Sequence, residues 1–354
     1  MEFVRGKKLG QGSFATVSLA VPKSQSPKFP PLMAVKSCGA SLSSSLRAEK
    51  LILEDLKGCP EIIRCFGDGI TSENGEKLYN VFLEYAGGGN LADKVKDSGF
   101  GGLTEFEVRL YTKALLKGLK YIHDSGYVHC DFKLQNILLC ADGSPRIADF
   151  GLAKRAGRTK AFPGCEFNGT PLYMSPEMLV GGEQDAPVDI WAMGCAVAEM
   201  AGGAPVWSGF SDVAELLMMI GVGDRVPQVP ENLSEEGKDF LGKCFVKDPS
   251  QRWTAEMLLN HPFVGGDQGL DGGCVSALKG GQENTTASTS PRCPFGWVSS
   301  ASCSITSLPS PVDFRQSGLW FSEDPSVETA MRLSVLKCEQ GPDWSVSDDW
   351  VTIR

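Results

Sequence analysis

The chain of 354 residues is longer than a usual single domain of ~100–200 residues, so we expect one large two-lobed unit or two domains. Hydrophobic residues make up 42% and charged residues 22%, ordinary values for a globular protein that exclude a collagen-like or wholly disordered chain. The 34 Lys and Arg against 43 Asp and Glu give a net charge of −9 without a long basic run, which argues against nucleic acid as a partner.

The chain also lacks the usual signals for membrane insertion and secretion. Its longest apolar run, residues 216–223, is far shorter than the ~20 residues of a membrane-spanning helix. Residues 1–8 have no apolar core of a signal peptide, so we expect no membrane partner and cytoplasmic residence, with entry into the nucleus left open. The twelve cysteines contain no Cys-x-x-Cys pair, and three histidines offer few ligands for zinc.

The first 85 residues predict a small β-rich lobe. Strand-like stretches at 4–9 and 16–21 flank a glycine-containing turn, and a third stretch at 32–36 follows a proline-rich loop. One helix interrupts the strands, because three apolar residues and one carboxylate recur at spacings of three and four: Leu46, Glu49, Leu53 and Leu56. A carboxylate on an apolar helix face is costly unless a cation pairs with it.

From residue 90 to about 264 the apolar periodicity is helical. Thr104 to Glu107 form a capping box that opens a long amphipathic helix. Its apolar stripe consists of Val108, Tyr111, Leu115, Leu119 and Ile122. Pro187 opens a second apolar helix that ends at Gly202-Gly203. Three further helices have predicted N-cap residues at Ser211, Ser234 and Thr254. A larger helical lobe therefore follows the β-rich lobe.

The last segment, 265–354, has a different composition. Between 285 and 310, 12 of 26 residues are Ser or Thr, a composition that buries too little apolar surface to offset the entropy of ordering. We expect a spacer without fixed structure over 265–312. Over 313–354 we favour a segment that docks on a partner protein, because it carries five large apolar residues: Phe314, Trp320, Phe321, Trp344 and Trp350.

Residues 9–17, Leu-Gly-Gln-Gly-Ser-Phe-Ala-Thr-Val, form a glycine-rich turn between the first two strands. Glycines let backbone N–H groups approach a phosphate without hindrance from a Cβ atom, although a plain hairpin turn is the commoner explanation of such a stretch. Lys36, in the next strand, can reach phosphate oxygens as a point charge. It is also the candidate cation for Glu49.

A cluster of polar residues follows at 129–136, and after an apolar strand and a turn comes Asp149-Phe150-Gly151. Phosphoryl transfer needs a carboxylate at the acceptor hydroxyl and separate oxygen ligands for magnesium. We assign Asp131 to the hydroxyl proton, Lys133 to the charge that grows on the transferring group, and Asn136 and Asp149 to Mg²⁺. Two loop aspartates alone are usually turn residues, but five polar groups in this order beside a glycine-rich loop and a Lys/Glu pair are not explained that way.

Together these motifs resemble the signature set of eukaryotic protein kinases over residues 4–264. Residues 169–177 look like the end of an activation segment and 189–194 like the helix that anchors the catalytic loop, while Arg252 matches the family's buried arginine that pairs with Glu177. The resemblance implies an α+β, bilobal protein kinase fold. Its parts are a small antiparallel-sheet N-lobe with one helix (about 1–85), a larger helical C-lobe (about 86–264) and a mostly disordered regulatory or docking tail (265–354).

The resemblance further implies ATP and Mg²⁺ as cofactors. It makes Leu83 the gatekeeper, Glu84 to Ala86 the adenine-binding hinge, and Leu53, His129 and Phe150 members of an apolar spine. The implied catalytic residues are Asp131, Lys133, Lys36 and Glu49, and the implied metal ligands are Asn136 and Asp149. The implied nucleotide-binding residues are Leu9, Gly10, Gln11, Gly12, Ser13, Phe14, Ala15, Val17, Ala34, Lys36, Leu83, Glu84, Ala86, Asn90 and Leu138.

Finer features indicate a subfamily. Lys133 two residues after Asp131, together with Thr170 before a proline, is similar to Ser/Thr kinases and unlike tyrosine kinases. The chain also resembles plant MAP kinase kinase kinases of the MEKK-like group. The features that carry this resemblance are the segments 8–14 and 169–177, the short spacing from Lys36 to Glu49, and Cys130. That resemblance implies MAP kinase kinases as the protein substrates. One alternative is a pseudokinase that serves as a scaffold, and the intact Lys and Asp residues argue against it. The other is a kinase of small molecules, and the segment 169–177 argues against it.

Three residues depart from the family pattern. Ala15 stands where a third glycine is common, and Ser175 replaces the usual alanine before Pro-Glu. Cys130 replaces an arginine that in many kinases pairs with a phosphorylated activation-loop residue. Thr159 is the one hydroxyl between Gly151 and Gly169, and we hypothesise that activity is set by synthesis or partner binding more than by loop phosphorylation. The alternative is that neighbouring basic residues receive a phosphate on Thr159: Lys154, Arg155, Arg158 and Lys160.

Overall fold

The computed structural model describes residues 2–12, 15–24, 27–99, 101–157, 169–181, 184–207, 210 and 212–265. Ser13, Phe14 and Thr159, on which sequence predictions fall, lie outside the described residues. The same holds for the predicted tail beyond Gly265.

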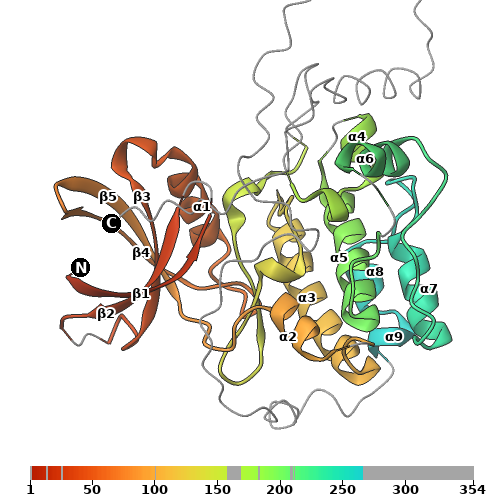
Figure 1. Cartoon of the computed structure of the whole chain (residues 1–354), viewed down its shortest axis with the longest axis horizontal. Coiled ribbons are helices and arrows are strands. Elements are labelled where there is room, and N and C mark those ends of the chain that lie inside the picture. The colour runs from red at the N-terminus through yellow and green to blue at the C-terminus, as the bar shows by residue number, and fades with distance from the viewer. Residues whose placement is uncertain are drawn as a thin grey trace, which may run out of the picture.

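The N-lobe is built on a five-stranded antiparallel sheet with strand order β1-β2-β3-β5-β4 (Figure 1). Its strands are β1 (Phe3–Gln11), β2 (Thr16–Pro22), β3 (Met33–Gly39), β4 (Cys65–Glu73) and β5 (Glu76–Glu84). The three predicted strands are confirmed; each ends one to three residues later than predicted, and β3 begins one residue later. A short 3-10 turn (Ala40–Leu42) leads from β3 into α1 (Ser44–Asp55), the one α-helix of this lobe within the described residues, which lies on the side of the sheet towards the C-lobe.

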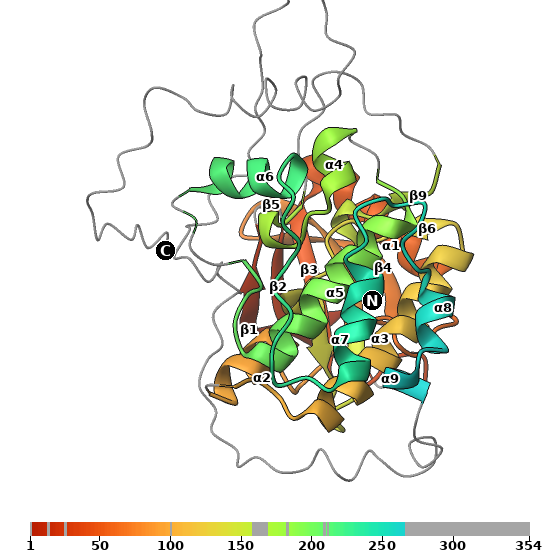
Figure 2. The same cartoon turned by 90° about the vertical axis from the view of Figure 1, so that its right-hand side faces the viewer.

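The C-lobe contains α2 (Leu91–Asp97), α3 (Glu105–Asp124), α4 (Pro176–Val180), α5 (Ala186–Gly202), α6 (Val213–Gly221), α7 (Glu235–Cys244), α8 (Ala255–Leu259) and α9 (Pro262–Gly265). Two short antiparallel pairs, β6 (Tyr127–Val128) with β9 (Lys154–Arg155) and β7 (Ile137–Leu139) with β8 (Pro145–Ile147), lie where this lobe meets the N-lobe. Figure 2 looks onto the helical lobe. Helix α5 contacts both α3 and α7, and in Figure 1 it lies between them.

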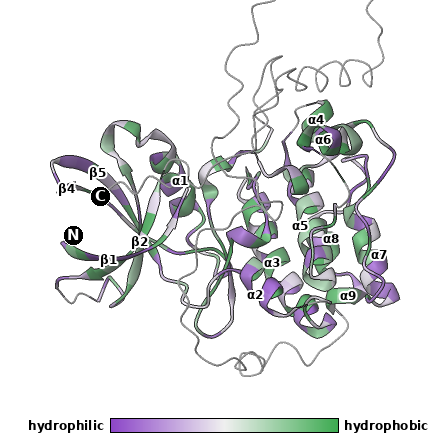
Figure 3. Ribbon diagram, viewed as in Figure 1, coloured by the Kyte–Doolittle hydropathy of each residue, from purple (hydrophilic) through white to green (hydrophobic). Residues whose placement is uncertain are grey.

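Helix α5 forms the centre of the C-lobe because it is apolar on nearly all sides. Every residue from Val188 to Ala201 is buried, and a helix of this kind is stable only when neighbouring elements surround it. In Figure 3, α5 is coloured pale to hydrophobic, whereas hydrophilic residues are prominent on the outer helix α2. The helix begins at the N-cap Asp185 and ends at Gly203, whose φ of 74° favours glycine, so the predicted helix is confirmed. Since α5 is rigidly packed, it can hold the loops that contact its first turn.

The predicted helix caps are confirmed with one exception. Ser234 and Thr254 cap α7 and α8, as expected. The prediction that Ser211 caps α6 is wrong, since Asp212 accepts a hydrogen bond from the backbone N–H of Glu215 at 2.7 Å. Aspartate is as good an N-cap as serine, and a cap at Asp212 places Glu215 in the first turn, near the positive end of the helix dipole.

Replacing Thr104 with alanine is expected to lower the free energy of unfolding by about 1 kcal/mol. Thr104 Oγ1 accepts from the N–H of Glu107 at 3.3 Å, and the Glu107 carboxylate accepts from the N–H of Thr104 at 3.2 Å. The change leaves the N–H of Glu107, in the first turn of α3, without its partner, and it removes the 2.9 Å bond from the Thr104 hydroxyl to the Glu107 carboxylate. Urea unfolding measures the loss, with Thr104→Ser as the control that keeps the cap. An alanine variant as stable as the serine variant would contradict the role of this cap.

None of the helices in the described ranges combines the length and the apolar character that crossing a membrane requires.

Candidate active site

The Lys36 ammonium lies between two carboxylates at the boundary of the lobes. From β3, its Nζ atom contacts Glu49 Oε1 at 2.9 Å and Oε2 at 2.7 Å, and Asp149 Oδ1 at 2.9 Å. Glu49 projects from α1 and is only 3% exposed. Burial acts to lower the pKa of Lys36, but the charges of Glu49 and Asp149 outweigh burial and raise it. The buried helix carboxylate therefore has the cation that its cost of burial demands.

Asp149 is held in an unusual backbone conformation next to this pair. Its φ of 63° and ψ of 72° are left-handed, a region that non-glycine residues enter at a cost of ~1–3 kcal/mol and that is frequent at functional sites. The Lys36 charge lowers the pKa of the Asp149 carboxyl to about 2 against the opposing effect of burial. The carboxylate is half exposed and ionised at neutral pH, as a metal ligand must be.

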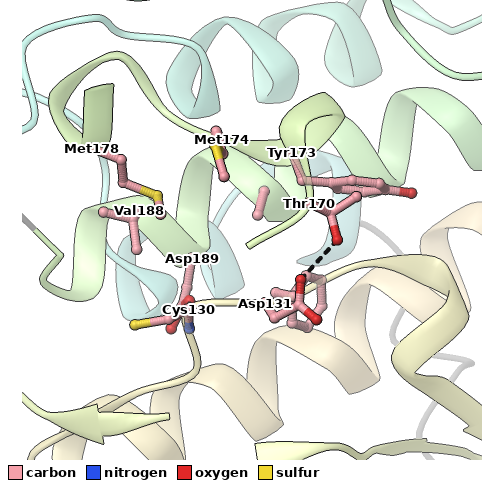
Figure 4. A pocket seen from close by; sticks show the side chains of 10 residues that line it. Cys130, Asp131, Thr170, Tyr173, Met174, Met178, Val188 and Asp189 are labelled. Atoms are coloured by element: carbon pink, nitrogen blue, oxygen red, sulfur yellow. Dashed lines mark hydrogen bonds between the residues drawn. The ribbon is translucent and has the colours of Figure 1, made fainter. Parts of the chain in front are cut away.

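Asp131 is the centre of a second polar group, on the loop between β6 and β7. Its Oδ1 accepts a hydrogen bond from the Thr170 hydroxyl at 2.8 Å, and its Oδ2 lies 2.9 Å from Lys133 Nζ (Figure 4). Lys133 Nζ also donates to Thr170 Oγ1 at 2.8 Å. Asn136 Nδ2 donates to the carbonyl oxygen and to Oδ2 of Asp131, at 2.8 and 3.0 Å. Because both of these bonds use the amide nitrogen, the amide oxygen of Asn136 is left for a cation.

The first turn of α5 fixes this loop. Buried Asp189 accepts backbone N–H groups from His129 at 2.8 Å and from Cys130 at 2.9 Å, and His123 Nε2 lies 2.9 Å from Oδ2. Burial opposes ionisation of Asp189, but the hydrogen bond and charge of His123 lower the pKa of its carboxyl. The φ of Cys130 is 65°, so the backbone turns sharply immediately before Asp131. The Asp189 carboxylate is therefore the group through which residues 189–194 anchor the loop, as expected.

The apolar spine residues join the loop to the N-lobe helix. The rings of His129 and Phe150 meet edge to face with centroids 4.8 Å apart, and both residues are buried together with Leu53 of α1. His129 Nε2 lies 3.1 Å from the carbonyl oxygen of Ala148, and His129 Nδ1 accepts from the N–H of Asp131 at 3.3 Å. These two bonds require the neutral Nε2–H tautomer.

The predicted nucleotide-binding residues come from both lobes. Six of them pack in or against the apolar cluster that connects the lobes: Leu9, Ala15, Val17, Ala34, Leu83 and Leu138. Gly10 pairs with Val17 and Gln11 with Thr16 across the β1–β2 hairpin, and the N–H of Gly12 donates to the Ala15 carbonyl at 2.8 Å. The described residues at the two ends of the glycine-rich turn therefore adjoin the apolar cluster, an arrangement that fits an adenine ring and a polyphosphate.

Two residues of the nucleotide set have side chains engaged elsewhere. The Glu84 carboxylate lies 3.4 Å from Arg146 Nε, so within the predicted hinge Glu84 offers its backbone. Asn90 Oδ1 accepts from the N–H of Asp93 at 2.9 Å and caps α2, and its backbone bridges to Leu138. Asn90 therefore has a structural role: it caps α2, and its backbone holds Leu138, one of the apolar residues of the predicted nucleotide site.

The sequence did not assign a role to Tyr173 or Glu199. The Tyr173 hydroxyl donates to the Glu199 carboxylate on α5 and accepts a backbone hydrogen bond from Leu134, next to Lys133. Burial raises the pKa of the Glu199 carboxyl to about 7. The sequence carried one signal for this pair: Glu199 lies in an otherwise apolar helix, and a buried carboxyl group needs a polar partner.

A pocket beside Asp131 is lined by Cys130, Met174, Met178 and Val188, with Thr170 at its edge (Figure 4). The segment that forms one wall is fixed by Glu177, whose carboxylate pairs in a fork with fully buried Arg252 at 2.6 and 3.0 Å, as predicted. The segment 169–177 is therefore attached to the core at both the Asp131 end and the Glu177 end.

Comparisons with known proteins agree with this arrangement. Residues 3–264 match the family model of the protein kinase domain. The chain is 48% identical to mitogen-activated protein kinase kinase kinase 20 of Arabidopsis thaliana over 358 residues, which covers 100% of both chains. It is 41% and 42% identical to kinases 17 and 18 of the same series, over 75% of this chain and 70% and 78% of theirs. The chain therefore belongs to the protein kinase family, and these three relatives are plant mitogen-activated protein kinase kinase kinases.

Proposed function

We propose that the chain transfers the γ-phosphoryl group of Mg-ATP to serine or threonine hydroxyls of MAP kinase kinases. The observation that carries this proposal is the position of Lys36, whose ammonium lies 2.7–2.9 Å from both Glu49 and Asp149. In this position the Glu49 carboxylate holds the Lys36 ammonium, and the Asp149 carboxylate can bind a metal. A relative that is named a mitogen-activated protein kinase kinase kinase and aligns over the whole chain supports the substrate class.

The roles of the chain's own residues follow from their contacts. Asp131 accepts or orients the proton of the substrate hydroxyl, as its 2.8 Å contact with the Thr170 hydroxyl illustrates. The hydroxyl oxygen forms a bond to the γ-phosphorus while the bond to the β-phosphate oxygen breaks and ADP leaves. Lys133 offsets the charge on the transferring group, and Lys36 positions the phosphates.

The donor set suits magnesium, which prefers oxygen ligands and keeps several waters. Asp149 supplies a carboxylate of low pKa and Asn136 an amide oxygen. Mg²⁺ bound there would neutralise the phosphate oxygens. The glycine-rich hairpin would cover the phosphates, with Ser13 and Phe14 as predicted members of that turn.

A phosphate-transfer assay with purified MAP kinase kinases tests this function. Each is supplied in a catalytically inactive form, with a generic basic protein as a second substrate and Asp149→Asn as the control enzyme. We expect transfer to Ser or Thr of at least one MAP kinase kinase and none with the control. Equal signals from both enzymes would instead favour the pseudokinase scaffold, an alternative that no observation supports.

Thr159→Ala is expected to retain activity within tenfold of the wild type. The reason is that the neutral thiol of Cys130 stands where other kinases have a phosphate-binding arginine. The measurement is the initial rate of phosphate transfer, with Thr170→Ala as a positive control because Thr170 contacts Asp131. A loss above tenfold for Thr159→Ala would show that phosphorylation is required.

The tail beyond residue 312 we propose as a docking segment. The alignment with kinase 20 covers this tail, whereas those with kinases 17 and 18 cover 75% of the chain. Deleting residues 313–354 is expected to weaken binding to a partner protein or change activity, and unchanged binding and activity would refute the idea.

Cytoplasmic residence stays a prediction that imaging of a tagged chain tests.

A further inference from the structure

Position 130 provides no cation for a phosphate. Cys130 is 8% exposed, and burial together with the Asp189 charge raises the pKa of its thiol, which is neutral. An activation segment is commonly ordered by a phosphate that pairs with basic side chains. If this chain works without that phosphate, another group must hold the start of its activation segment.

A carboxylate of α1 contacts this start. Asp55 Oδ2 lies 3.3 Å from Arg155 NH2 and accepts a hydrogen bond from the Tyr127 hydroxyl at 2.5 Å. The Arg155 guanidinium also lies over the Tyr127 ring, 4.3 Å from its centroid. Tyr127 and Arg155 are paired residues of the β6–β9 ladder, which the bond from Ala156 N–H to the Gly126 carbonyl extends at 3.0 Å.

The connection joins the two parts of the active site that must move together. Asp55 is the last residue of α1, the helix that carries Glu49. Arg155 follows Asp149 by one strand and one turn. The Asp55 contact is therefore a further link between α1 and the segment of Asp149, in addition to the Lys36 contacts and the packing of Leu53 with Phe150.

We propose that Asp55 is a positioning residue whose carboxylate does the work of an activation-segment phosphate, holding Arg155 and Tyr127 so that α1 and the Asp149 segment stay docked without phosphorylation. The inference rests on the proposed kinase function. The Asp55 carboxylate, a permanent anion on α1, would replace the phosphate that other kinases add to the activation loop.

The size of the effect depends on burial. Asp55 and Arg155 are 53% and 52% exposed, and an exposed ion pair alone shifts an equilibrium by about fivefold at most. Tyr127 is 5% exposed, so its hydroxyl has few other partners and its bond to Asp55 strengthens the link. Removal of the Asp55 charge should therefore shift the docking equilibrium away from the docked state by roughly three- to tenfold.

The test uses the full chain after phosphatase treatment, and wild-type kcat should be the same with and without that treatment. Asp55→Asn and Tyr127→Phe are compared with Glu54→Gln, a matched control in which the neighbouring carboxylate of α1 pairs with Lys50 on the same helix. We expect both test variants to lower kcat about three- to tenfold, and the control to stay within twofold. Asp55→Glu, which keeps the charge, should restore most of the activity.

Hydrogen exchange gives a readout that does not depend on activity. The amide of Ala156 should exchange faster in Asp55→Asn than in wild type or Glu54→Gln, with melting temperatures unchanged within about 2 °C. The loss in the double variant Asp55→Asn/Arg155→Gln should be smaller than the sum of the two single losses, because the contact between Asp55 and Arg155 is removed in each of them. Unchanged kcat and exchange in Asp55→Asn, or a wild type inactivated by phosphatase, would overturn the proposal. A wild type that transfers no phosphate would refute the kinase function instead, and the exchange comparison would still decide the Asp55 contact.

Discussion

Replacing Asp131 with asparagine is expected to lower kcat by about 10²–10⁴-fold, the usual contribution of a positioned proton acceptor. The asparagine keeps the shape and can still meet Thr170, but it carries no charge for Lys133, 2.9 Å away, and cannot take a proton. Affinity for ATP should change little, because Asp131 is not among the groups around Lys36. Steady-state kinetics with ATP and an inactive MAP kinase kinase measure both quantities.

Asp124→Asn is the matched control for this prediction. Asp124 also pairs with a lysine, Lys120, but on the exposed surface of α3. We expect its kcat to match the wild type. Should Asp131→Asn keep kcat within tenfold of this control at an unchanged melting temperature, Asp131 would not be the proton acceptor.

The second large effect concerns stability. Arg252→Met is expected to lower the free energy of unfolding by about 3–5 kcal/mol, because it leaves the Glu177 carboxylate buried without its partner. Arg252 is fully buried and also donates to the carbonyl oxygens of Pro187 and Val246, which lose a donor as well. Urea unfolding followed by circular dichroism measures the difference.

A double variant separates the unpaired charge from the other losses. Arg252→Met combined with Glu177→Gln removes the buried charge, so we expect it to be more stable than Arg252→Met alone. It should stay below the wild type because the two carbonyl groups remain without their donor. A loss below about 1 kcal/mol in Arg252→Met would mean that water or another group replaces the arginine.

Those parts of the site that follow from local rules could be predicted from the sequence. The spacing of apolar residues predicts the helix that carries Glu49, and the cost of burying a carboxylate predicts Lys36 as its partner, in agreement with the 2.7 Å contact. The capping box at Thr104 was likewise predicted, since it depends only on residues three apart. The Glu177–Arg252 pair came from the family resemblance.

Contacts between distant segments without a motif could not be predicted. Asp55, Tyr127 and Arg155 are separated by up to 100 residues, and no local sequence pattern links Asp55 to the other two. Tyr173 was read as part of a motif, but its bond to Glu199 depends on how the segment 169–177 lies on α5. The left-handed backbone of Asp149 and Cys130 also results from tertiary contacts, which override local preference.

Calorimetric titration with ATP, in the presence and absence of magnesium, tests the central claim most directly: Lys36 with Glu49 on one side and Asn136 with Asp149 on the other hold Mg-ATP. We predict that the wild type binds one nucleotide and that magnesium strengthens binding. In Asp149→Asn this gain should fall at least about tenfold, the equivalent of one lost charged contact. A wild type that binds no ATP with magnesium supplied, or a magnesium effect that survives in Asp149→Asn, would contradict the account.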